Sequence, residues 1–177
     1  YYSFLISNIF CIYYFYAANL FIISLMTSSS PSTLEPKLRV AVLLLAAGEG
    51  SRLGVYPKAL LRKEGQTLLR RFSNAIQAFS PIECLVVTGF HAQAIEAEIA
   101  HINASLRYPM RMIRNDAPER GQPSSVRLGL ESMQYQYDVL LIALSDQPNI
   151  GILEVGALLD QFSSLGSEEA VVVPLVE

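Results

Sequence analysis

The sequence predicts an α/β fold built around a mostly parallel sheet, and two observations support this prediction. First, short apolar runs alternate along the chain with segments whose apolar residues recur at helical spacing. Second, the apolar runs are continuous, as in VAVLLL within residues 39–45, where a half-buried strand would alternate apolar and polar residues. Continuous apolar strands are typical of parallel sheets that helices cover on both faces.

The predicted elements follow in a regular order. The predicted strands share the apolar character and span residues 39–45, 83–88, 110–114, 138–144 and 170–174. The predicted helices place apolar residues three and four positions apart and span residues 67–79, 91–102, 124–133 and 151–162. This alternation predicts a single Rossmann-like domain over residues 39–177, with three layers in the order α/β/α.

The N-terminal segment differs from this domain, because residues 1–34 carry no charge and Glu35 is the first charged residue. Residues 4–26 are apolar and long enough to span a bilayer, yet they lack the positive flank of a signal peptide. We interpret residues 1–25 as a leader: upstream sequence translated through a gene-model error, a membrane anchor, or a buried helix. Residues 26–38 are interpreted as a Ser/Pro-rich linker.

Charge and cysteine content limit the partners and the compartment. The net charge of −3 belongs entirely to the part of the chain after the leader, and this mild acidity argues against a nucleic-acid partner. Two cysteines and two histidines provide neither a zinc motif nor a disulfide framework, which fits a reducing, cytoplasmic location. A membrane partner is expected only if the leader is real.

The most informative segment is the loop AAGEGSRLGVYPK at residues 46–58, which follows the first predicted strand. Its glycines allow backbone N–H groups to approach a polyphosphate closely, and Arg52 and Lys58 can neutralise the remaining charge. The loop is not a dinucleotide fingerprint, because Gly54 comes one position late, and it is not a Walker loop, because Val55 follows that glycine. The loop therefore predicts a nucleoside triphosphate site.

Two further polar segments fall at the predicted carboxyl edge of the sheet, where ligands of such folds bind. Ser124 can cap the helix predicted to begin there, and Ser124 and Ser125 are candidate base or ribose contacts. Asp146 directly follows an apolar strand, where a carboxylate is costly unless it serves a ligand. Near a triphosphate that ligand is Mg²⁺, and the alternative is that Asp146 caps the helix beginning near Gly151.

Three ordered motifs in residues 39–177 resemble those of the MobA-like nucleotidyltransferases, most closely the branch that attaches CMP to molybdopterin. The opening motif is similar to LAAG at 45–48, SRLG at 51–54 and PKALL at 57–61. The metal motif resembles SDQP at 145–148. The middle motif is similar to Asn115, Gly121, Ser124, Ser125, Arg127, Gly129 and Leu130.

This resemblance implies transfer of a nucleoside monophosphate from an NTP, with CTP favoured, to a phosphorylated acceptor, with molybdopterin favoured, and release of pyrophosphate. Arg52, Lys58 and Asp146 would be catalytic, and Asp146 would hold Mg²⁺. The implied nucleotide-binding residues are Leu45, Ala46, Ala47, Gly48, Gly50, Ser51, Arg52, Lys58, Ser124 and Ser125. The alternatives are a sugar 1-phosphate or methylerythritol phosphate nucleotidyltransferase and, in another class, a non-catalytic nucleotide-binding fragment.

The chain also departs from the family pattern. Val55 and Tyr56 separate Gly54 from the proline of PK where the molybdopterin branch has one residue. Gly50 stands where serine is common, which leans toward the alternative transferases, and Ser145 stands where the metal motif has glycine. The family continues beyond residue 177 into acceptor-binding segments and a second metal-binding carboxylate, so we expect a C-terminally truncated domain. His91 and His101 are expected to be surface residues.

Overall fold

The computed structural model describes residues 3–6, 9–12, 20–24, 38–50, 56–164 and 171–172. Within these residues, six strands form one sheet in the order β10-β3-β9-β4-β7-β8. The strands are β3 (Leu20–Ser24), β4 (Val40–Ala46), β7 (Glu83–Thr88), β8 (Arg111–Arg114), β9 (Val139–Leu144) and β10 (Val171–Val172). The contiguous strands β9, β4, β7 and β8 are parallel, which confirms the mostly parallel sheet.

The remaining strand pairings are antiparallel. β3 pairs with β9, and β10 pairs with β3, so the last predicted strand enters the sheet antiparallel to its neighbour. Two small hairpins complete the strands: β1 (Ser3–Ile6) with β2 (Ile9–Ile12), and β5 (Arg62–Lys63) with β6 (Gln66–Thr67). The boundaries that we expect for the leader, the linker and the domain stay predictions.

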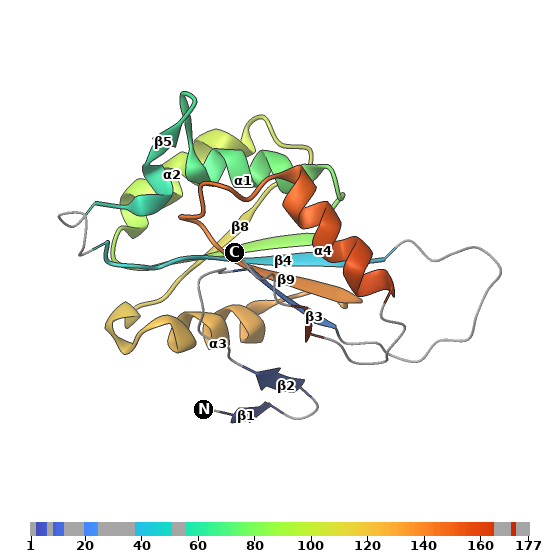
Figure 1. The fold of residues 1–177 in the computed structure, drawn as a ribbon. Helices are drawn as coiled ribbons and strands as arrows, with labels where there is room; N and C mark the ends of the chain where they lie inside the picture. The colour runs from blue at the N-terminus through green and yellow to red at the C-terminus, as the bar shows by residue number, and fades with distance from the viewer. Residues whose placement is uncertain are drawn as a thin grey trace.

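Helices cover both faces of the sheet, as predicted (Figure 1). The helices are α1 (Leu68–Gln77), α2 (Ala92–Asn103), α3 (Gln122–Ser132) and α4 (Ile152–Ser164), with 3₁₀ turns η2 (Lys58–Leu60) and η3 (Pro118–Arg120). α1, α2 and α4 lie on one face and α3 lies on the other. Among the described residues, none of the helices combines the length and the apolar character needed to cross a bilayer.

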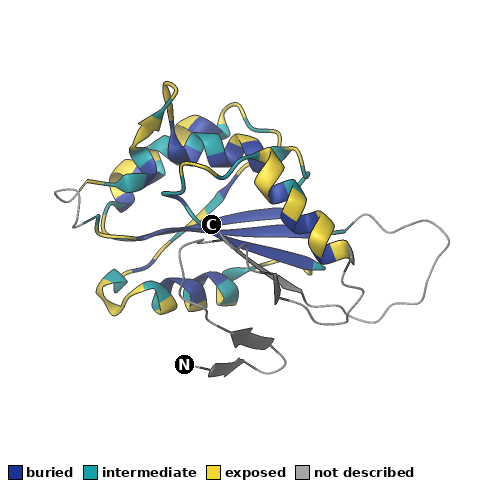
Figure 2. Ribbon diagram, in the orientation of Figure 1, coloured by how far each residue is buried: buried dark blue, intermediate teal, exposed yellow. Residues whose placement is uncertain are grey.

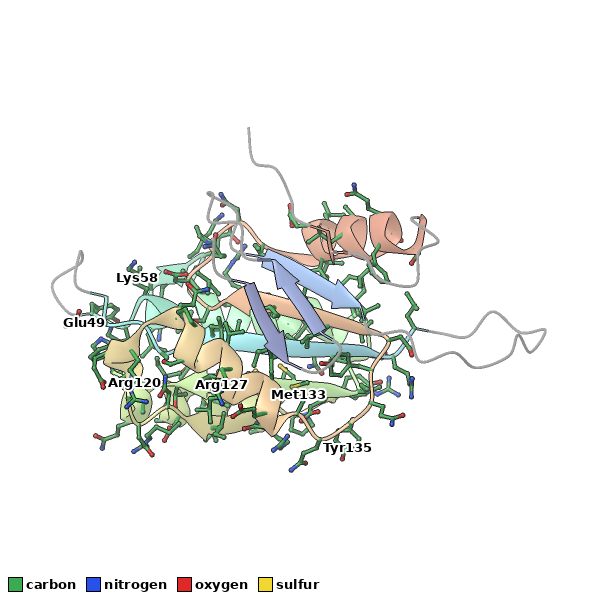
Figure 3. The ribbon with its side chains drawn as sticks, turned by 90° about the horizontal axis from the view of Figure 1, so that it is seen from below. Glu49, Lys58, Arg120, Arg127, Met133 and Tyr135 are labelled. Atoms are coloured by element: carbon green, nitrogen blue, oxygen red, sulfur yellow. The ribbon has the colours of Figure 1, made fainter. Side chains whose placement is uncertain are left out.

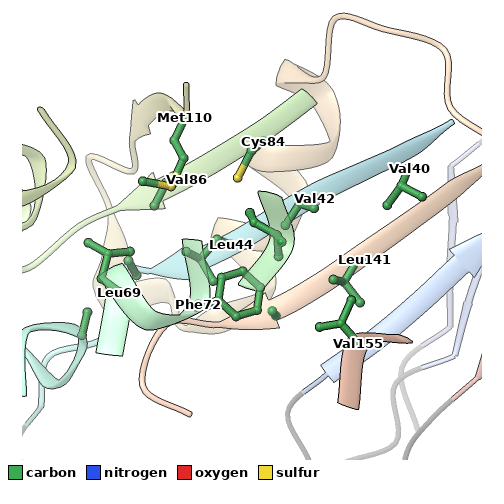
Figure 4. Close-up of a cluster of buried hydrophobic side chains, with 14 of the residues drawn as sticks. Val40, Val42, Leu44, Leu69, Phe72, Cys84, Val86, Met110, Leu141 and Val155 are labelled. Atoms are coloured by element: carbon green, nitrogen blue, oxygen red, sulfur yellow. The ribbon is translucent and has the colours of Figure 1, made fainter. Parts of the chain in front are cut away.

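The two faces of β4 explain why its sequence is continuously apolar. Val42 and Leu44 pack in the cluster under α1, α2 and α4, and Leu43 and Leu45 pack in the cluster over α3. All seven residues of β4 are buried, and Figure 2 shows the same burial along the central strands. Figure 4 shows the larger cluster, in which Phe72 of α1 lies against the sheet. Burying each such side chain contributes about 1.5–3 kcal/mol to folding, so these layers hold the sheet in place.

The start of α3 differs from the expectation. The predicted helix begins at Ser124 with that serine as its cap, but α3 begins at Gln122 and Gly121 occupies the cap position. Pro123 fits the first turn of a helix, because it lacks only an N–H that would have no helical partner there. Ser124 therefore lies inside the helix, and its hydroxyl donates to the Gly121 carbonyl (2.7 Å).

The strand order also identifies the position of a ligand site. From β4 the chain proceeds to β7 and β8 on one side, and then crosses to β9 on the other side of β4. Open α/β sheets bind ligands beyond the carboxyl ends of the strands where this reversal occurs. The site is therefore expected beyond β4 and β9.

Candidate nucleotide site

A cavity of about 570 Å³ lies at the carboxyl ends of β4 and β9. Eight predicted nucleotide or metal residues line it: Leu45, Ala46, Ala47, Gly48, Gly50, Lys58, Ser125 and Asp146. Ser124 is not among the lining residues, and Ser51 and Arg52 lie outside the described residues. The cavity thus brings together three segments that are distant in the sequence.

The glycine-rich loop after β4 leaves room above its backbone. Gly48 is exposed to the cavity side, and a Cβ built there would meet no atom within 4 Å. Gly50 has a φ of +73°, and a Cβ there would lie 2.1 Å from the Tyr56 carbonyl oxygen. Only glycine fits that position, because any side chain would displace the backbone of residue 56 or of the loop.

Lys58 and Asp146 lie close together beside this loop, at the wall of the cavity. The Lys58 Nζ lies 3.7 Å from the Asp146 Oδ2, and their side chains are 35% and 27% exposed. Lys58 is the first residue of η2, which the buried Ala59 fixes to the core. Figure 3 shows Lys58 and Glu49 at the same end of the sheet. A lysine and a carboxylate at this spacing, open to a cavity, can both contact a charged ligand.

Neighbouring backbone contacts hold Asp146 in place. The N–H of Ser145 donates to the Leu45 carbonyl (3.0 Å), which joins the end of β9 to the end of β4. Beyond Asp146, Lys63 of the β5–β6 hairpin donates to the Pro148 carbonyl and to Asn149 Oδ1 (both 3.1 Å). The loop that carries Asp146 is therefore fixed on both sides.

The hydrogen bond that links a carboxylate to the start of α4 comes from Glu154. The N–H of Gly151, directly before α4, donates to Glu154 Oε2 at 2.9 Å. A glutamate at the third helical position that reaches back to this N–H forms one half of a capping box. Asp146 contacts Lys58 instead.

A hydrogen-bonded cluster fixes the serines beside the cavity. The buried Asn115 side chain donates to Ser124 Oγ (2.9 Å) and to Ser125 Oγ (3.0 Å), and its Oδ1 accepts from the Ala117 N–H (3.0 Å). Ser125 is buried at the cavity wall, whereas the Ser124 hydroxyl donates to the Gly121 carbonyl. Of the two serines, Ser125 is therefore the one in position to contact a ligand.

Several lining residues were not predicted. Phe90, Glu119 and Gln122 line the cavity, and Phe90 is 45% exposed. The position of Phe90 in the sequence predicts a loop at the carboxyl ends of the strands. Its apolar side chain, however, gave no indication that it would line the cavity. The motif arginine Arg127 is exposed and pairs with Glu131 (2.8 Å).

The donor set fits Mg²⁺ in one particular way. The described residues contain no group of three His, Cys, Asp or Glu side chains that could hold a metal ion by themselves. Mg²⁺ in nucleotide enzymes is commonly held by one or two carboxylates together with substrate phosphates, so a protein cage is not required. Asp146 offers one such carboxylate at the cavity wall.

Curated proteins share sequence with this chain, among them an oxidoreductase and a cytidylyltransferase. Nicotine blue oxidoreductase of Paenarthrobacter nicotinovorans is 37% identical over 120 residues, which cover 68% of this chain and 55% of that protein. The 2-C-methyl-D-erythritol 4-phosphate cytidylyltransferase of Thermobifida fusca is 32% identical over 145 residues, covering 80% and 56%. The chain thus spans little more than half the length of either relative.

Solved structures show the same fold. A nucleotidyl transferase from Methanothermobacter is similar with a TM-score of 0.56 and 26% identity, covering 69% of this chain and 57% of that one. A complex of the Mycobacterium tuberculosis protein Rv0371c with manganese has a TM-score of 0.53 over 71% and 60% of the two chains. At 20% identity that likeness is one of fold, and the manganese is a property of that complex.

A family model described as the MobA-like NTP transferase domain matches residues 42–176, which include every described segment that lines the cavity. The parallel sheet from residue 42 onward, the glycine-rich loop and the carboxylate after β9 lie within this match. The chain therefore belongs to the MobA-like NTP transferase family.

Proposed function

We propose that this protein transfers a nucleoside monophosphate from an NTP, with CTP as the favoured nucleotide, to a phosphorylated acceptor, with molybdopterin as the favoured acceptor. The observation that carries the proposal is the Lys58–Asp146 pair, 3.7 Å apart beside a glycine-rich loop in one cavity. The 32% identity to a cytidylyltransferase supports CTP.

In the proposed reaction, an oxygen of the acceptor phosphate attacks the α-phosphorus of the nucleotide in line with the leaving group. The bond between the α-phosphorus and its bridging oxygen breaks, and pyrophosphate leaves with the electron pair. Such reactions need little covalent participation by the protein, because positioning and charge stabilisation supply most of the rate. The residues that hold and neutralise the phosphates therefore determine the activity.

Each residue of the site has a distinct task in this proposal. Backbone amides of residues 47–51 would hold phosphate oxygens, and Arg52 would bind the β- and γ-phosphates. Lys58 would neutralise negative charge that develops at the α-phosphate. Ser125 would contact the base or the ribose. Asp146 would hold Mg²⁺ together with phosphate oxygens, and the bound ion would supply further charge neutralisation.

The acceptor has two alternatives. A sugar 1-phosphate and a methylerythritol phosphate both present the phosphate oxygen that the reaction needs, and Gly50 in the loop favours them over molybdopterin. The cytidylyltransferase among the relatives adds support to methylerythritol phosphate as the acceptor.

A second candidate function is a redox reaction, because a relative with 37% identity is named an oxidoreductase. The glycine-rich loop could hold the pyrophosphate of a dinucleotide in place of a triphosphate. The loop nevertheless lacks the glycine spacing of the common dinucleotide fingerprint, which favours nucleotidyl transfer. A nucleotide-binding fragment without turnover is the third candidate.

The discriminating experiment measures pyrophosphate release for each of the four NTPs with molybdopterin, a sugar 1-phosphate and methylerythritol phosphate. We expect release with CTP and one of these acceptors, and molybdopterin is favoured. Oxidation of NADH or NADPH in the absence of pyrophosphate release would favour the redox candidate. Nucleotide binding with neither activity would leave the non-catalytic candidate and overturn the proposed transfer.

A further inference from the structure

His91 contacts the glycine-rich loop from a separate part of the chain. It lies immediately before α2 and is half-buried, and its Nε2 lies 2.7 Å from the Glu49 carbonyl oxygen. A carbonyl oxygen can only accept a hydrogen bond, so the His91 Nε2 carries a hydrogen and donates it. The histidine that we expect to be a mere surface residue therefore holds the backbone of the candidate phosphate loop.

This hydrogen bond also determines the direction of the next amide. The carbonyl of Glu49 and the N–H of Gly50 belong to one peptide unit, and the described residues contain no cis peptide. In a trans peptide the carbonyl and the N–H point in opposite directions. Holding the Glu49 carbonyl toward His91 thus turns the Gly50 N–H away from His91, in a loop that lines the cavity.

The loop between β7 and α2 packs against the glycine-rich loop, and this packing holds the backbone of His91 in place. A Cβ added to Gly89 would lie 2.8 Å from Ala47 Cβ and 2.9 Å from both the Ala47 carbonyl oxygen and Pro118 Cβ. The Phe90 N–H also faces the Ala47 carbonyl, at 3.5 Å. Residues 89–91 therefore pack along the glycine-rich loop, first against residue 47 and then against residue 49.

We propose that His91 is a positioning residue: it acts through Glu49 to hold residues 47–50 of the glycine-rich loop in the conformation that binds nucleotide phosphates. The inference rests on the proposed function, because the ligand is the same NTP. Glycine residues lose more conformational freedom than others when they are fixed, so a loop held in advance binds more tightly. Loss of one such hydrogen bond should weaken nucleotide binding about three- to tenfold.

The test compares four variants of the whole chain. His91→Ala and His91→Phe both remove the donor, and the second keeps a ring of similar size. His91→Gln carries an amide N–H at a similar reach and serves as the rescue. His101→Ala is the matched control, because His101 is exposed in the last turn of the same helix. Circular dichroism establishes that each variant is folded, and His91→Phe tests the donor if the cavity left by alanine unfolds the protein.

Hydrogen exchange, CTP binding and steady-state kinetics are measured on each variant. Hydrogen exchange is followed over residues 46–58 in nucleotide-free protein, titration gives the dissociation constant for CTP, and the kinetics give KM and kcat. Removal of the donor should speed exchange in this segment, raise the dissociation constant three- to tenfold and raise KM more than it lowers kcat. His91→Gln should return exchange and CTP affinity most of the way to the wild-type values, and His101→Ala should match the wild type.

The outcomes separate this inference from the proposed function. Wild-type exchange and CTP affinity in His91→Phe would overturn the inference, and so would faster exchange with unchanged affinity. If the wild-type protein bound no nucleotide, the proposed function would fail. Hydrogen exchange would then still decide whether His91 holds the loop, because it is measured without a ligand.

Discussion

The amino ends of the central strands and the carboxyl ends of β4 and β9 carry similar charged residues in different arrangements. At the amino edge, the Glu83 side chain is only 1% exposed, pairs with Arg111 and accepts from the N–H groups of Gln134 and Tyr135. Beside it, Arg39 and Asp138 pair at 2.6 Å directly before β4 and β9. Each of these charges is neutralised by a neighbour in close contact.

At the carboxyl edge, Lys58 and Asp146 are 3.7 Å apart and face a cavity of about 570 Å³. Their separation leaves both groups accessible to a ligand, and glycine-rich backbone lies beside them. Charge at the amino ends of the strands is neutralised by close neighbours, whereas the pair beyond the carboxyl ends of β4 and β9 is open to the cavity. At the carboxyl end of β8, Arg114 is again closely paired, with Glu96. Substitutions at the amino ends should therefore change stability, and substitutions of the open pair should change activity.

The largest change in stability should come from breaking the amino edge. Glu83→Ala would leave the Gln134 and Tyr135 N–H groups and the Arg111 guanidinium without their shared carboxylate. We expect the free energy of unfolding to fall by about 3 kcal/mol, measured by urea denaturation. The nucleotide affinity of the folded variant should stay at the wild-type value, and a large loss of affinity would show that the two edges are not independent.

Substitution of Lys58 beyond the carboxyl ends of β4 and β9 should have an effect of similar size, but on activity and not on stability. Lys58→Ala should lower the rate of nucleotidyl transfer about 10²-fold, because a charge that stabilises the transition state is lost. The free energy of unfolding should change little, since the pair is partly exposed. Arg62→Ala, at an exposed position of the nearby hairpin, is the matched control and should retain full activity. Equal rates in both variants would remove Lys58 from the mechanism.

A smaller effect is expected from the loop backbone. Gly50→Ala should raise the dissociation constant for CTP about tenfold, because alanine at a φ of +73° is strained by about 1–2 kcal/mol and its Cβ would meet the Tyr56 carbonyl. Isothermal titration measures this loss. Gly65→Ala, with a φ of +80° in the β5–β6 turn and open space for a Cβ, separates backbone strain from the effect on the site. The interpretation is wrong if both variants bind CTP equally well.

The smallest effect is a pH dependence of stability at the amino edge. Hydrogen bonds from Arg39 hold the pKa of Asp138 below its ordinary value of 3.8. Because the pKa is lowered in the folded state, the pair stabilises the protein above the ordinary pKa, and this contribution is lost as the pH falls through the lower, folded pKa. Thermal melts from pH 7 to pH 3 should show a steeper acid loss for the wild type than for Asp138→Asn. Parallel curves would contradict this assignment.

The parts of the fold that could be predicted are those set by local pattern. The apolar runs of β4, β7 and β9 indicated buried parallel strands, since only a strand covered on both faces is continuously apolar. The β5–β6 hairpin was missed, because its residues are polar and the turn at Glu64 and Gly65 defines it. The antiparallel outer strand β10 is placed by its pairing with β3, and no local sequence pattern encodes that pairing.

The site was predicted where its residues carry chemistry in their own side chains. Lys58 and Asp146 were found because strand ends of a parallel sheet converge, although they are distant in the sequence. The segment that carries Phe90 and His91 was expected at the same end of the sheet, but their contacts were not predicted, because they depend on how closely residues 89–91 approach residues 47–49 in the folded chain. A hydrogen bond between a side chain and a distant carbonyl has no sequence signature.

Titration with CTP in the presence and absence of Mg²⁺, for the wild type and Asp146→Asn, tests the central claim most directly. If the carboxyl edge is a nucleotide site in which Asp146 holds the ion, Mg²⁺ should tighten CTP binding to the wild type and have little effect on the variant. The same gain from Mg²⁺ in both proteins, or no binding of CTP to the wild type, would contradict the account.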